Sequence, residues 1–349
     1  MGRNRLLFRT NAVGNGFDDH ALQRMCKQGD LARVRPGVYA TPGDAATDIT
    51  TRHVIAVHAA IAKQRTTAVV SHASAAAIHG LPLWDLSLAR VHLTQPGTAG
   101  GHTTRRRHQH TAHLSPVQVT EVDGLPVSTV ARTIVDLART EQFDRAVAVG
   151  DAALNNAMTT VDELLEEITR LPGRSGATRA RAAVLAMDPR SESIGESWSR
   201  IVMDRAGLPP RELQRVIRVN GDLLGRADYF FDEHGIVGEF DGRVKYSRQI
   251  DDPRDPGQIA WDEKKREDRL RDAGLEVMRW TWADLDAPCR LQGLFGSART
   301  RASARPGSHH RRRRPVRRLR SPATGSPPNH VTESCAHRCR AGSTSPRAP

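Results

Sequence analysis

The chain has 349 residues and a formal net charge of +13 at pH 7, and this length predicts about two domains. The charge is unevenly distributed, because residues 297–349 hold 13 arginines and one acid, Glu333, for a net +12. The other 296 residues therefore carry only 13 − 12 = +1. A folded body this close to neutral excludes nucleic-acid binding through its overall charge, so any such binding requires local basic patches.

The sequence also indicates in which cellular compartment the protein is expected. No apolar run reaches the ~18 residues that a transmembrane helix needs, so we expect no membrane partner. Cys26 and Cys289 are isolated and no secretory signal is present, which favours the reducing cytoplasm. Cys335 and Cys339 flank His337, but a single pair of this spacing is weak support for a metal knuckle.

A helix and a hairpin are predicted between residues 18 and 42. Asp18 or Asp19 can cap the helix through a side-chain oxygen, and apolar residues recur on one of its faces. Residues 31–40 then read as a short basic hairpin with Pro36-Gly37 at its turn. A helix leading into a basic hairpin is typical of the end of a winged helix-turn-helix.

The run from Gly29 to Tyr39, GDLARVRPGVY, resembles the N-terminal domain of AbiEi-type antitoxins. In that family this domain binds DNA. The resemblance therefore implies that residues 1–50 form a winged-helix-like DNA-binding unit, with Arg33 and Arg35 as nucleic-acid contacts. The same residues can instead form a small structural cap with a solvated arginine face, and the sequence leaves both readings open.

Residues 51–175 are predicted to form a helical and mixed middle region. Helices are expected over 51–63, 71–79 and 131–139, and a strand over 89–94. Residues 97–113 read as a loop rich in glycine and arginine. The run from Ser71 to Leu81 resembles the middle region of the same antitoxin-like family.

Two features of this region could carry chemistry. Arg105, Arg106 and Arg107 can contact DNA phosphates, although a solvated charge run has the same appearance. His72 and His79 are seven residues apart on one predicted helix face and can bind a metal or a phosphate. Histidines on a helix near a core are more often structural, and we favour that role for both.

Residues 176–296 are predicted to form an α/β domain after a break at Gly173–Gly176. The expected order is a helix, a three-strand meander, a charged helix and a final strand. Asn220-Gly221 is a strong hairpin signal. The predicted positions are residues 191–206, 213–219, 226–231, 236–242, 258–273 and 275–280.

Three carboxylates lie inside two adjacent predicted strands of this domain. They are Asp228, Glu239 and Asp241, and residues two apart in a strand share a face. A carboxylate buried in an apolar strand needs a compensating cation, and hard divalent cations prefer oxygen ligands. The alternative is a solvated network of ion pairs with Arg226, Arg243 and the cations of the following helix.

Residues 191–288 resemble the PD-(D/E)XK nuclease superfamily, in particular the branch related to very-short-patch-repair endonucleases. The resemblance implies that Asp228 and Glu239 hold Mg²⁺ or Mn²⁺, and that Glu196 on the leading helix assists. Asp241 stands where the motif has lysine, so the cation would come from Lys245, or from Lys264 or Lys265 on the next helix. A metal held in this way activates water and polarises a phosphoryl oxygen.

Beyond residue 296 the composition shifts to Arg, Ser, Pro, Gly and Ala, and periodicity is lost. This pattern predicts a disordered basic tail over residues 297–349.

The sequence thus predicts an α/β (α+β overall) protein with four segments: a winged-helix-like unit, a helical and mixed middle, a nuclease-like mixed sheet flanked by helices, and the tail. The leading functional reading is a DNA-acting protein with a Mg²⁺-dependent endonuclease domain. The alternative is a non-catalytic DNA-binding regulator of the type IV antitoxin class, with a toxin partner and a degenerate nuclease fold. The oligomeric state is not indicated by the sequence.

Overall fold

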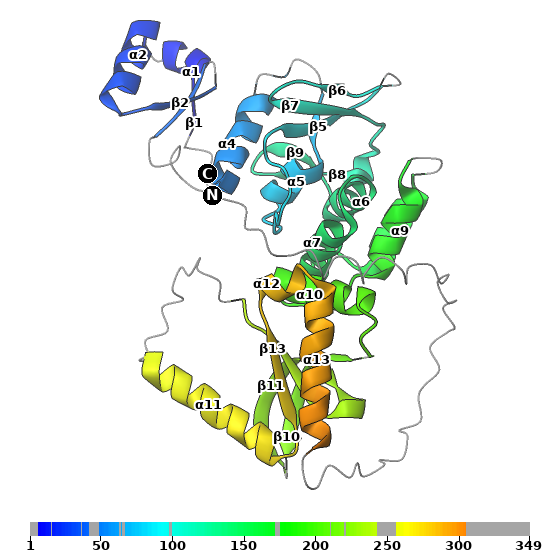
Figure 1. Cartoon of the computed structure of the whole chain (residues 1–349). Helices are drawn as coiled ribbons and strands as arrows, with labels where there is room; N and C mark the ends of the chain where they lie inside the picture. Colours follow the sequence, from blue (N-terminus) through cyan, green and yellow to red (C-terminus); the bar gives the residue numbers. More distant parts are fainter. Residues whose placement is uncertain are drawn as a thin grey trace, which may run out of the picture. The chain divides into compact units, whose positions relative to one another are not determined.

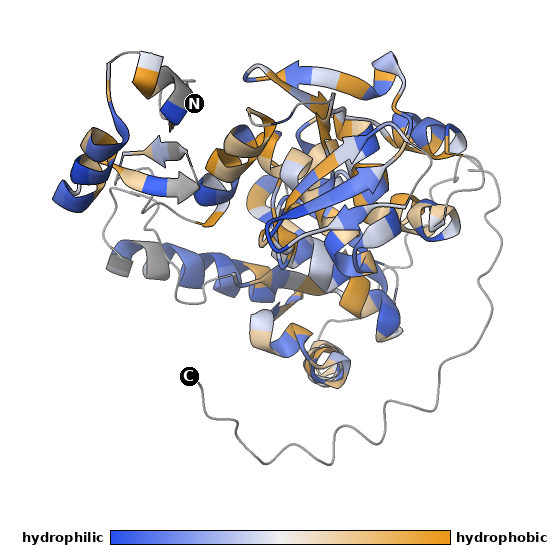
Figure 2. Ribbon diagram, turned by 90° about the horizontal axis from the view of Figure 1, so that it is seen from above, coloured by the Kyte–Doolittle hydropathy of each residue, from blue (hydrophilic) through white to orange (hydrophobic). Residues whose placement is uncertain are grey.

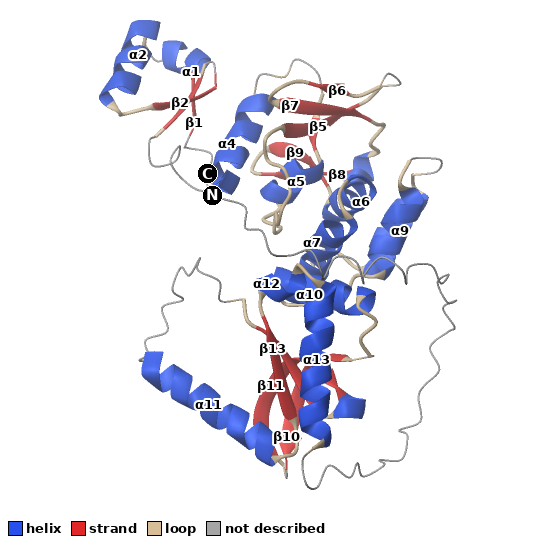
Figure 3. Cartoon of the chain, viewed as in Figure 1, coloured by secondary structure: helices blue, strands red, loops and turns tan. Residues whose placement is uncertain are grey.

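The computed structural model confirms a mixed α+β protein (Figures 1 and 3). Clustering of internal contacts divides the chain into two compact units, Met1–Ser197 and Trp198–Pro349. In the described residues, no helix combines the length and apolar character needed to cross a membrane. The described residues are 6–14, 16–35, 37–41, 49–62, 64, 67–97, 100–171, 175–209, 211–219, 221–242 and 256–304.

The first unit begins with two short helices and a small antiparallel sheet of order β1-β3-β2. Asp18 caps the second helix by accepting the Ala21 N–H at 2.6 Å, and Gly29 ends it in the left-handed conformation (φ 84°). Ala12, Leu22 and Tyr39 form the core of this small body, so the predicted helix and hairpin are confirmed. The elements are β1 (Leu6–Phe8), α1 (Arg9–Gly14), α2 (Asp19–Gln28), β2 (Ala32–Arg35) and β3 (Val38–Ala40).

A mixed six-stranded sheet of order β6-β7-β5-β4-β9-β8 follows in the same unit. The pairs β5–β7 and β4–β9 are parallel, and the other neighbouring pairs are antiparallel. The core on this sheet joins Val57 and Ala75 of two helices to Val70, Leu93 and Val127 of the strands. The elements are α4 (Ile49–Ile61), β4 (Val69–Val70), α5 (His72–Ile78), β5 (Val91–Gln95), β6 (His102–Thr103), β7 (Arg107–Thr111), η2 (Pro116–Gln118), β8 (Val119–Val122) and β9 (Leu125–Ser128).

The loop predicted over residues 97–113 contains two strands, β6 and β7, so that prediction was wrong. The sequence of β7 is Arg-His-Gln-His-Thr and has no apolar residue to reveal its period. The strand is specified instead by parallel pairing with β5, in which His92 lies opposite His108 and Thr94 opposite His110. Tertiary pairing here overrides the local pattern.

Four helices complete the first unit: α6 (Val130–Thr140), α7 (Phe143–Asn155), α8 (Val161–Thr169) and α9 (Ala177–Leu185). They pack around an ionic cluster with almost no solvent exposure. Arg132 Nε donates to Asp136 Oδ2 at 2.7 Å, and Arg132 Nη1 lies 3.6 Å from Glu167 Oε1. Gln118 donates its side-chain amide to the same glutamate, so both buried acids have partners.

The second unit contains a mixed four-stranded sheet of order β10-β11-β12-β13. The predicted order of helix, meander, helix and strand is confirmed. The long helix α11 is the crossover that makes β13 parallel to β12, and Figure 2 shows it mostly in hydrophilic colours. The elements are α10 (Ile194–Arg205), which spans the unit boundary, β10 (Glu212–Val219), β11 (Asp222–Phe231), η3 (Asp232–His234), β12 (Ile236–Phe240), α11 (Pro256–Asp272), β13 (Glu276–Trp280), α12 (Trp282–Leu285) and α13 (Pro288–Ser303).

Helix α13 extends beyond residue 296, where the disordered tail was expected to begin. Phe295, Ala298 and Ala302 are buried in the core of the second unit, and Arg301 Nε pairs with Glu276 Oε1 at 2.6 Å. The arginine-rich composition conceals this apolar period in the sequence. Residues 305–349 of the predicted tail lie outside the described residues.

Candidate functional site

The two acids at the centre of the predicted metal site lie on neighbouring strands. Tyr229 of β11 pairs with Gly238 of β12, so antiparallel order makes Asp228 and Glu239 the next pair along the ladder. Both side chains are partly buried. Asp228 Oδ2 accepts a hydrogen bond from the Phe240 N–H at 2.9 Å.

Glu239 is bound by two arginines. Its Oε1 accepts from Arg266 Nη2 at 2.6 Å, and its Oε2 accepts from Arg279 Nε at 2.9 Å. Burial lowers the pKa of Arg279, but the hydrogen bond and charge of Glu239 outweigh burial, and the pKa is raised overall. A metal ion at Glu239 would share the carboxylate with two guanidinium groups that already neutralise its charge.

These ion pairs belong to a network between β12, β13 and α11. Arg279 also pairs with Glu267 at 2.6 Å and with Glu263, and Arg266 pairs with Glu263 at 3.2 Å. The network corresponds to the ion-pair alternative raised by the sequence. Arg266 is one of the helix cations that the sequence predicted for this network, and Arg279 of β13 was not predicted. Arg243 lies outside the described residues.

Glu196 has a local structural role at the start of α10. Its carboxylate accepts from the Glu192 N–H at 2.9 Å and from Ser193 Oγ at 2.7 Å, while its own N–H donates to Ser193 Oγ at 3.2 Å. The hydrogen bonds between Ser193 and Glu196 resemble a capping box, but the backbone donor to the carboxylate is Glu192.

The structure shows no hydrogen bond or ion pair between the candidate lysines that it describes and the acidic pair Asp228 and Glu239. Lys245 lies outside the described residues, and Lys264 is exposed on α11. Lys265 lies over the ring of Trp261, with Nζ 5.2 Å from its centroid. Asp241 donates its N–H to the Trp280 carbonyl at 2.8 Å.

The basic candidates lie in the first unit. Arg33 is exposed on β2, and the side chain of Arg35 lies outside the described residues. Arg105 and Arg106 are exposed between β6 and β7. Arg107 is half-buried and donates to Gln64 Oε1 at 2.9 Å, so it is held by the protein itself.

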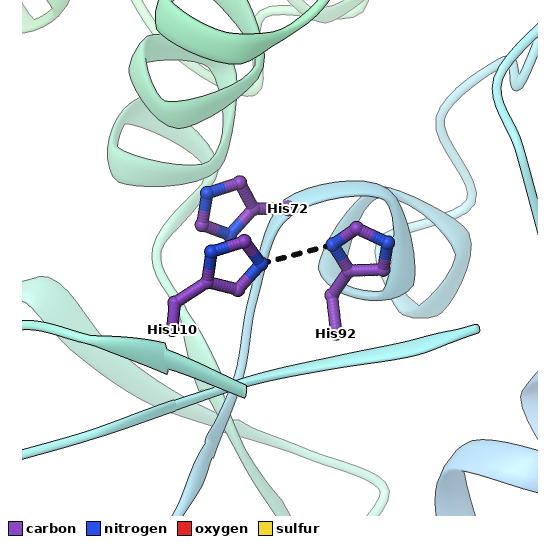
Figure 4. Close-up of side chains that lie close together, drawn as sticks. All are labelled: His72, His92 and His110. Atoms are coloured by element: carbon purple, nitrogen blue, oxygen red, sulfur yellow. Dashed lines mark hydrogen bonds between the residues drawn. The ribbon is translucent and has the colours of Figure 1, made fainter. Parts of the chain in front are cut away.

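A different group of side chains has the geometry of a metal centre. His72, His92 and His110, referred to here as the histidine cluster, each offer a ring nitrogen, and these atoms lie within 4.8 Å of one another. Figure 4 shows the three rings facing one another from α5, β5 and β7. In the described part of the chain, no other group of three or more His, Cys, Asp or Glu side chains converges in this way.

Contacts between the rings fix the cluster. His92 Nδ1 lies 3.0 Å from His110 Nε2, and the rings of His72 and His110 stack with centroids 3.7 Å apart. His108 stacks on the other side of His110 at 4.0 Å. These residues share one face of the sheet, because β5 and β7 run parallel in register.

His72 is held in an uncommon conformation. Its φ is 52°, in the left-handed region that residues other than glycine seldom adopt. Its Nδ1 lies 3.0 Å from Ser71 Oγ, which also accepts from Thr94 Oγ1 at 2.8 Å. The surrounding structure therefore stabilises a backbone geometry that directs this ring toward β7.

The electrostatic setting keeps the cluster neutral. Burial, reinforced by neighbouring histidines and arginines and opposed by Asp136, lowers the pKa of His72 to about 4. Burial and adjacent histidines lower the pKa values of His92 and His110 to about 3. The rings thus present lone pairs at neutral pH, the form in which imidazole binds metals.

Comparison with known families places the histidine cluster in a recognised domain. Residues 67–185 match the AbiEi antitoxin C-terminal domain family. The match covers 185 − 67 + 1 = 119 of the 349 residues, so the similarity concerns one segment of the chain. This AbiEi-like segment contains the cluster and Arg105–Arg107, whereas Arg33, Asp228 and Glu239 lie outside it.

Two relatives and one solved structure align with a longer part of the chain, and their names state no function. The uncharacterized proteins MT2308 and Rv2248, from two strains of Mycobacterium tuberculosis, are each 28% identical over 270 residues, which is 74% of this chain and 87% of the relative. The crystal structure of RV2827C protein from Mycobacterium tuberculosis aligns with a TM-score of 0.36 and 13% identity over 63% of this chain and 85% of that chain. A TM-score this low supports no structural argument.

Sequence reasoning did not find the cluster within the AbiEi-like segment. It paired His72 with His79, but His79 Nε2 donates to the Ser128 carbonyl at 2.8 Å and has a structural role. The available signal was the alternation of His108 and His110 with one residue between them. That spacing places two imidazoles on one face only if the segment is a strand. The composition of residues 97–113 predicts a loop instead.

Proposed function

We propose that this protein is a DNA-binding regulator of the antitoxin type. The observation that carries the proposal is the match of residues 67–185 to the AbiEi antitoxin C-terminal domain. An antitoxin of this class acts on DNA and counteracts a toxin, so the proposed partners are DNA and a toxin protein. This was the alternative reading of the sequence, and the match favours it over an endonuclease.

The N-terminal body supports DNA binding through its second helix. In a helix-turn-helix the second helix enters the major groove, and α2 occupies that position. His20, Gln23, Arg24 and Lys27 are all exposed on it. Their spacing of three and four residues places them on one face, opposite the buried Leu22.

A surface ion pair connects α2 to α1. Arg9 at the start of α1 donates from Nε and Nη2 to both carboxylate oxygens of Asp19, each at 2.6 Å. This two-point ion pair connects the two helices and holds α2 against α1. Base-reading side chains need a rigid support of this kind.

Basic side chains near α2 and on the sheet supply candidate phosphate contacts. Arg33 on β2 has the place of a wing residue, and Arg105 and Arg106 form a second exposed basic point. Phosphate contacts position a protein on DNA without reading its sequence. The proposal therefore assigns specificity to α2 and general affinity to these arginines.

The endonuclease reading is the second candidate function, because Asp228 and Glu239 adjoin one another across β11 and β12. We rank it lower because Glu239 is bound by Arg266 and Arg279. Incubating supercoiled plasmid with the protein and Mg²⁺ or Mn²⁺ tests it. Cleavage that Asp228→Asn abolishes would reinstate the endonuclease.

A reporter fused to the protein's own upstream DNA tests the regulator. Wild-type protein is expected to repress the reporter, and Arg24→Ala is expected to relieve most of the repression. Arg181→Ala, an exposed arginine on α9, is the matched control and should repress as wild type does. Repression that is absent in wild type, or equal in the two variants, would contradict the assignment.

A further inference from the structure

We infer that His72, His92 and His110 form a binding site for a divalent transition-metal ion of the zinc class. The three imidazoles come from three elements, α5, β5 and β7, and their nitrogens lie within 4.8 Å of one another. Imidazole nitrogen is a preferred ligand of Zn²⁺. The site is independent of the predicted Mg²⁺ site, whose ligands are carboxylates in the other unit.

The ring nitrogens are close to the spacing that a zinc ion imposes. Zn–N bonds of about 2.0–2.1 Å at tetrahedral angles separate two ligand nitrogens by about 3.3 Å. His92 Nδ1 and His110 Nε2 are 3.0 Å apart. The third nitrogen lies within 4.8 Å of the other two. Because the rings of His72 and His110 stack at 3.7 Å, one of them must tilt on metal binding for both lone pairs to reach the ion.

The 3.0 Å separation of the two closest nitrogens fits a shared ion as well as a hydrogen bond between the two rings. Without a metal, one of the pair must carry the proton that it donates to the other. With a metal, both lone pairs point at the ion and no proton is needed. His72 is oriented through Nδ1 by Ser71 Oγ, which leaves Nε2 as its metal-binding atom and resembles the outer hydrogen bond of metal-ligating histidines.

The charge around the cluster predicts the fourth ligand. Asp136 attracts positive charge at His72 and His110 but is itself bound by Arg132 and Arg139. The two arginines therefore largely neutralise the carboxylate charge of Asp136. Three neutral imidazoles add no charge of their own, so the bound metal ion retains its charge of +2. The fourth position is therefore expected to take water, hydroxide or a small anion, as in zinc sites with three protein ligands.

The test measures metal uptake by the full-length chain without a polyhistidine tag. Cys335→Ser and Cys339→Ser are introduced throughout, because these residues flank His337 and could bind zinc themselves. After chelator treatment, Co²⁺ is titrated as a spectroscopic probe and Zn²⁺ by calorimetry. We expect one equivalent of either metal and a Zn²⁺-dependent rise in melting temperature, because binding favours the folded state.

His92→Gln and His110→Gln are each expected to weaken binding by more than about 100-fold. The control is His102→Gln, an exposed histidine on β6 of the same sheet, which should bind as the background does. X-ray absorption of the Zn²⁺-loaded background protein needs no histidine variant and should show three nitrogen ligands, a lighter fourth ligand such as oxygen, and no sulfur. No uptake, sulfur ligation, or equal affinity in the His92 and His102 variants would overturn the site.

Discussion

Glu239 decides between the two readings of the acidic strands. Its carboxylate is 15% exposed and is bound by Arg266 and Arg279. A metal site predicts that removing this charge relieves repulsion with Asp228 and stabilises the metal-free protein. The observed ion pairs predict the opposite sign, because two partly buried arginines would lose their acceptor.

We therefore expect Glu239→Gln to lower the free energy of unfolding by about 1–2 kcal/mol, measured by urea denaturation. Glu263→Gln is the control, since Glu263 is 41% exposed in the same network and should cost less. Mg²⁺ should leave the wild-type melting temperature unchanged. A stabilised Glu239→Gln protein, with a Mg²⁺-dependent shift in wild type, would restore the metal reading.

Arg132 is the cation on which the core of the AbiEi-like segment depends. It is 1% exposed and lies beside Asp136 and Glu167, which are equally buried. Arg132→Met would leave two acids buried without this partner, at a cost of about 3–5 kcal/mol. Thermal unfolding measures the loss, and Arg145→Met is the control, because its partner Asp85 is 64% exposed and a pair with a solvated member is worth about 0–1 kcal/mol.

Similar losses for Arg132→Met and Arg145→Met would show that the buried cluster is no more important than a surface pair.

At the scale of elements, α13 carries the core of the second unit beyond residue 296. Truncation after residue 304 should leave the melting temperature almost unchanged. Truncation after residue 296 removes Ala298, Ala302 and the Arg301–Glu276 pair, which we expect to lower stability by about 1–3 kcal/mol. Circular dichroism melts of the two proteins give the comparison, and equal melting temperatures would mean that the last turns of α13 add nothing.

The elements that could be predicted are those with local signals. Asp18 and Gly29 bound α2 as expected, and Gly235 adopts φ 59° between β11 and β12, where a turn was predicted. The element order of the second unit followed from such signals. Apolar alternation and turn residues are sufficient wherever a strand has one buried face.

The elements that could not be predicted depend on distant pairing. The polar strand β7 forms only beside β5, and the end of α13 is specified by its packing on the core. The histidine cluster could not be predicted for the same reason, because its members lie on three elements that tertiary structure brings together. The acidic pair was correctly placed on adjacent strands, but its arginine partners come from α11 and β13.

At the scale of the whole molecule, the proposal places most of the net positive charge in residues 305–349 and the recognition of DNA sequence in α2. Residues 305–349 carry 11 arginines and one acid, for 11 − 1 = +10 of the total +13. Deleting them should weaken binding to unrelated DNA and flatten its salt dependence, because fewer counterions are released. Fluorescence anisotropy against salt concentration measures both effects. An unchanged salt slope would place the phosphate contacts on the body.

The central claim is that the protein recognises DNA as an antitoxin-type regulator does. The most direct measurement is the affinity of the full-length chain for the DNA upstream of its own gene, relative to a shuffled fragment of equal composition at fixed salt. We predict a preference of at least about 10³-fold, lost in Arg24→Ala and retained when residues 305–349 are deleted. Equal affinity for the two fragments, at every salt concentration, would contradict the account.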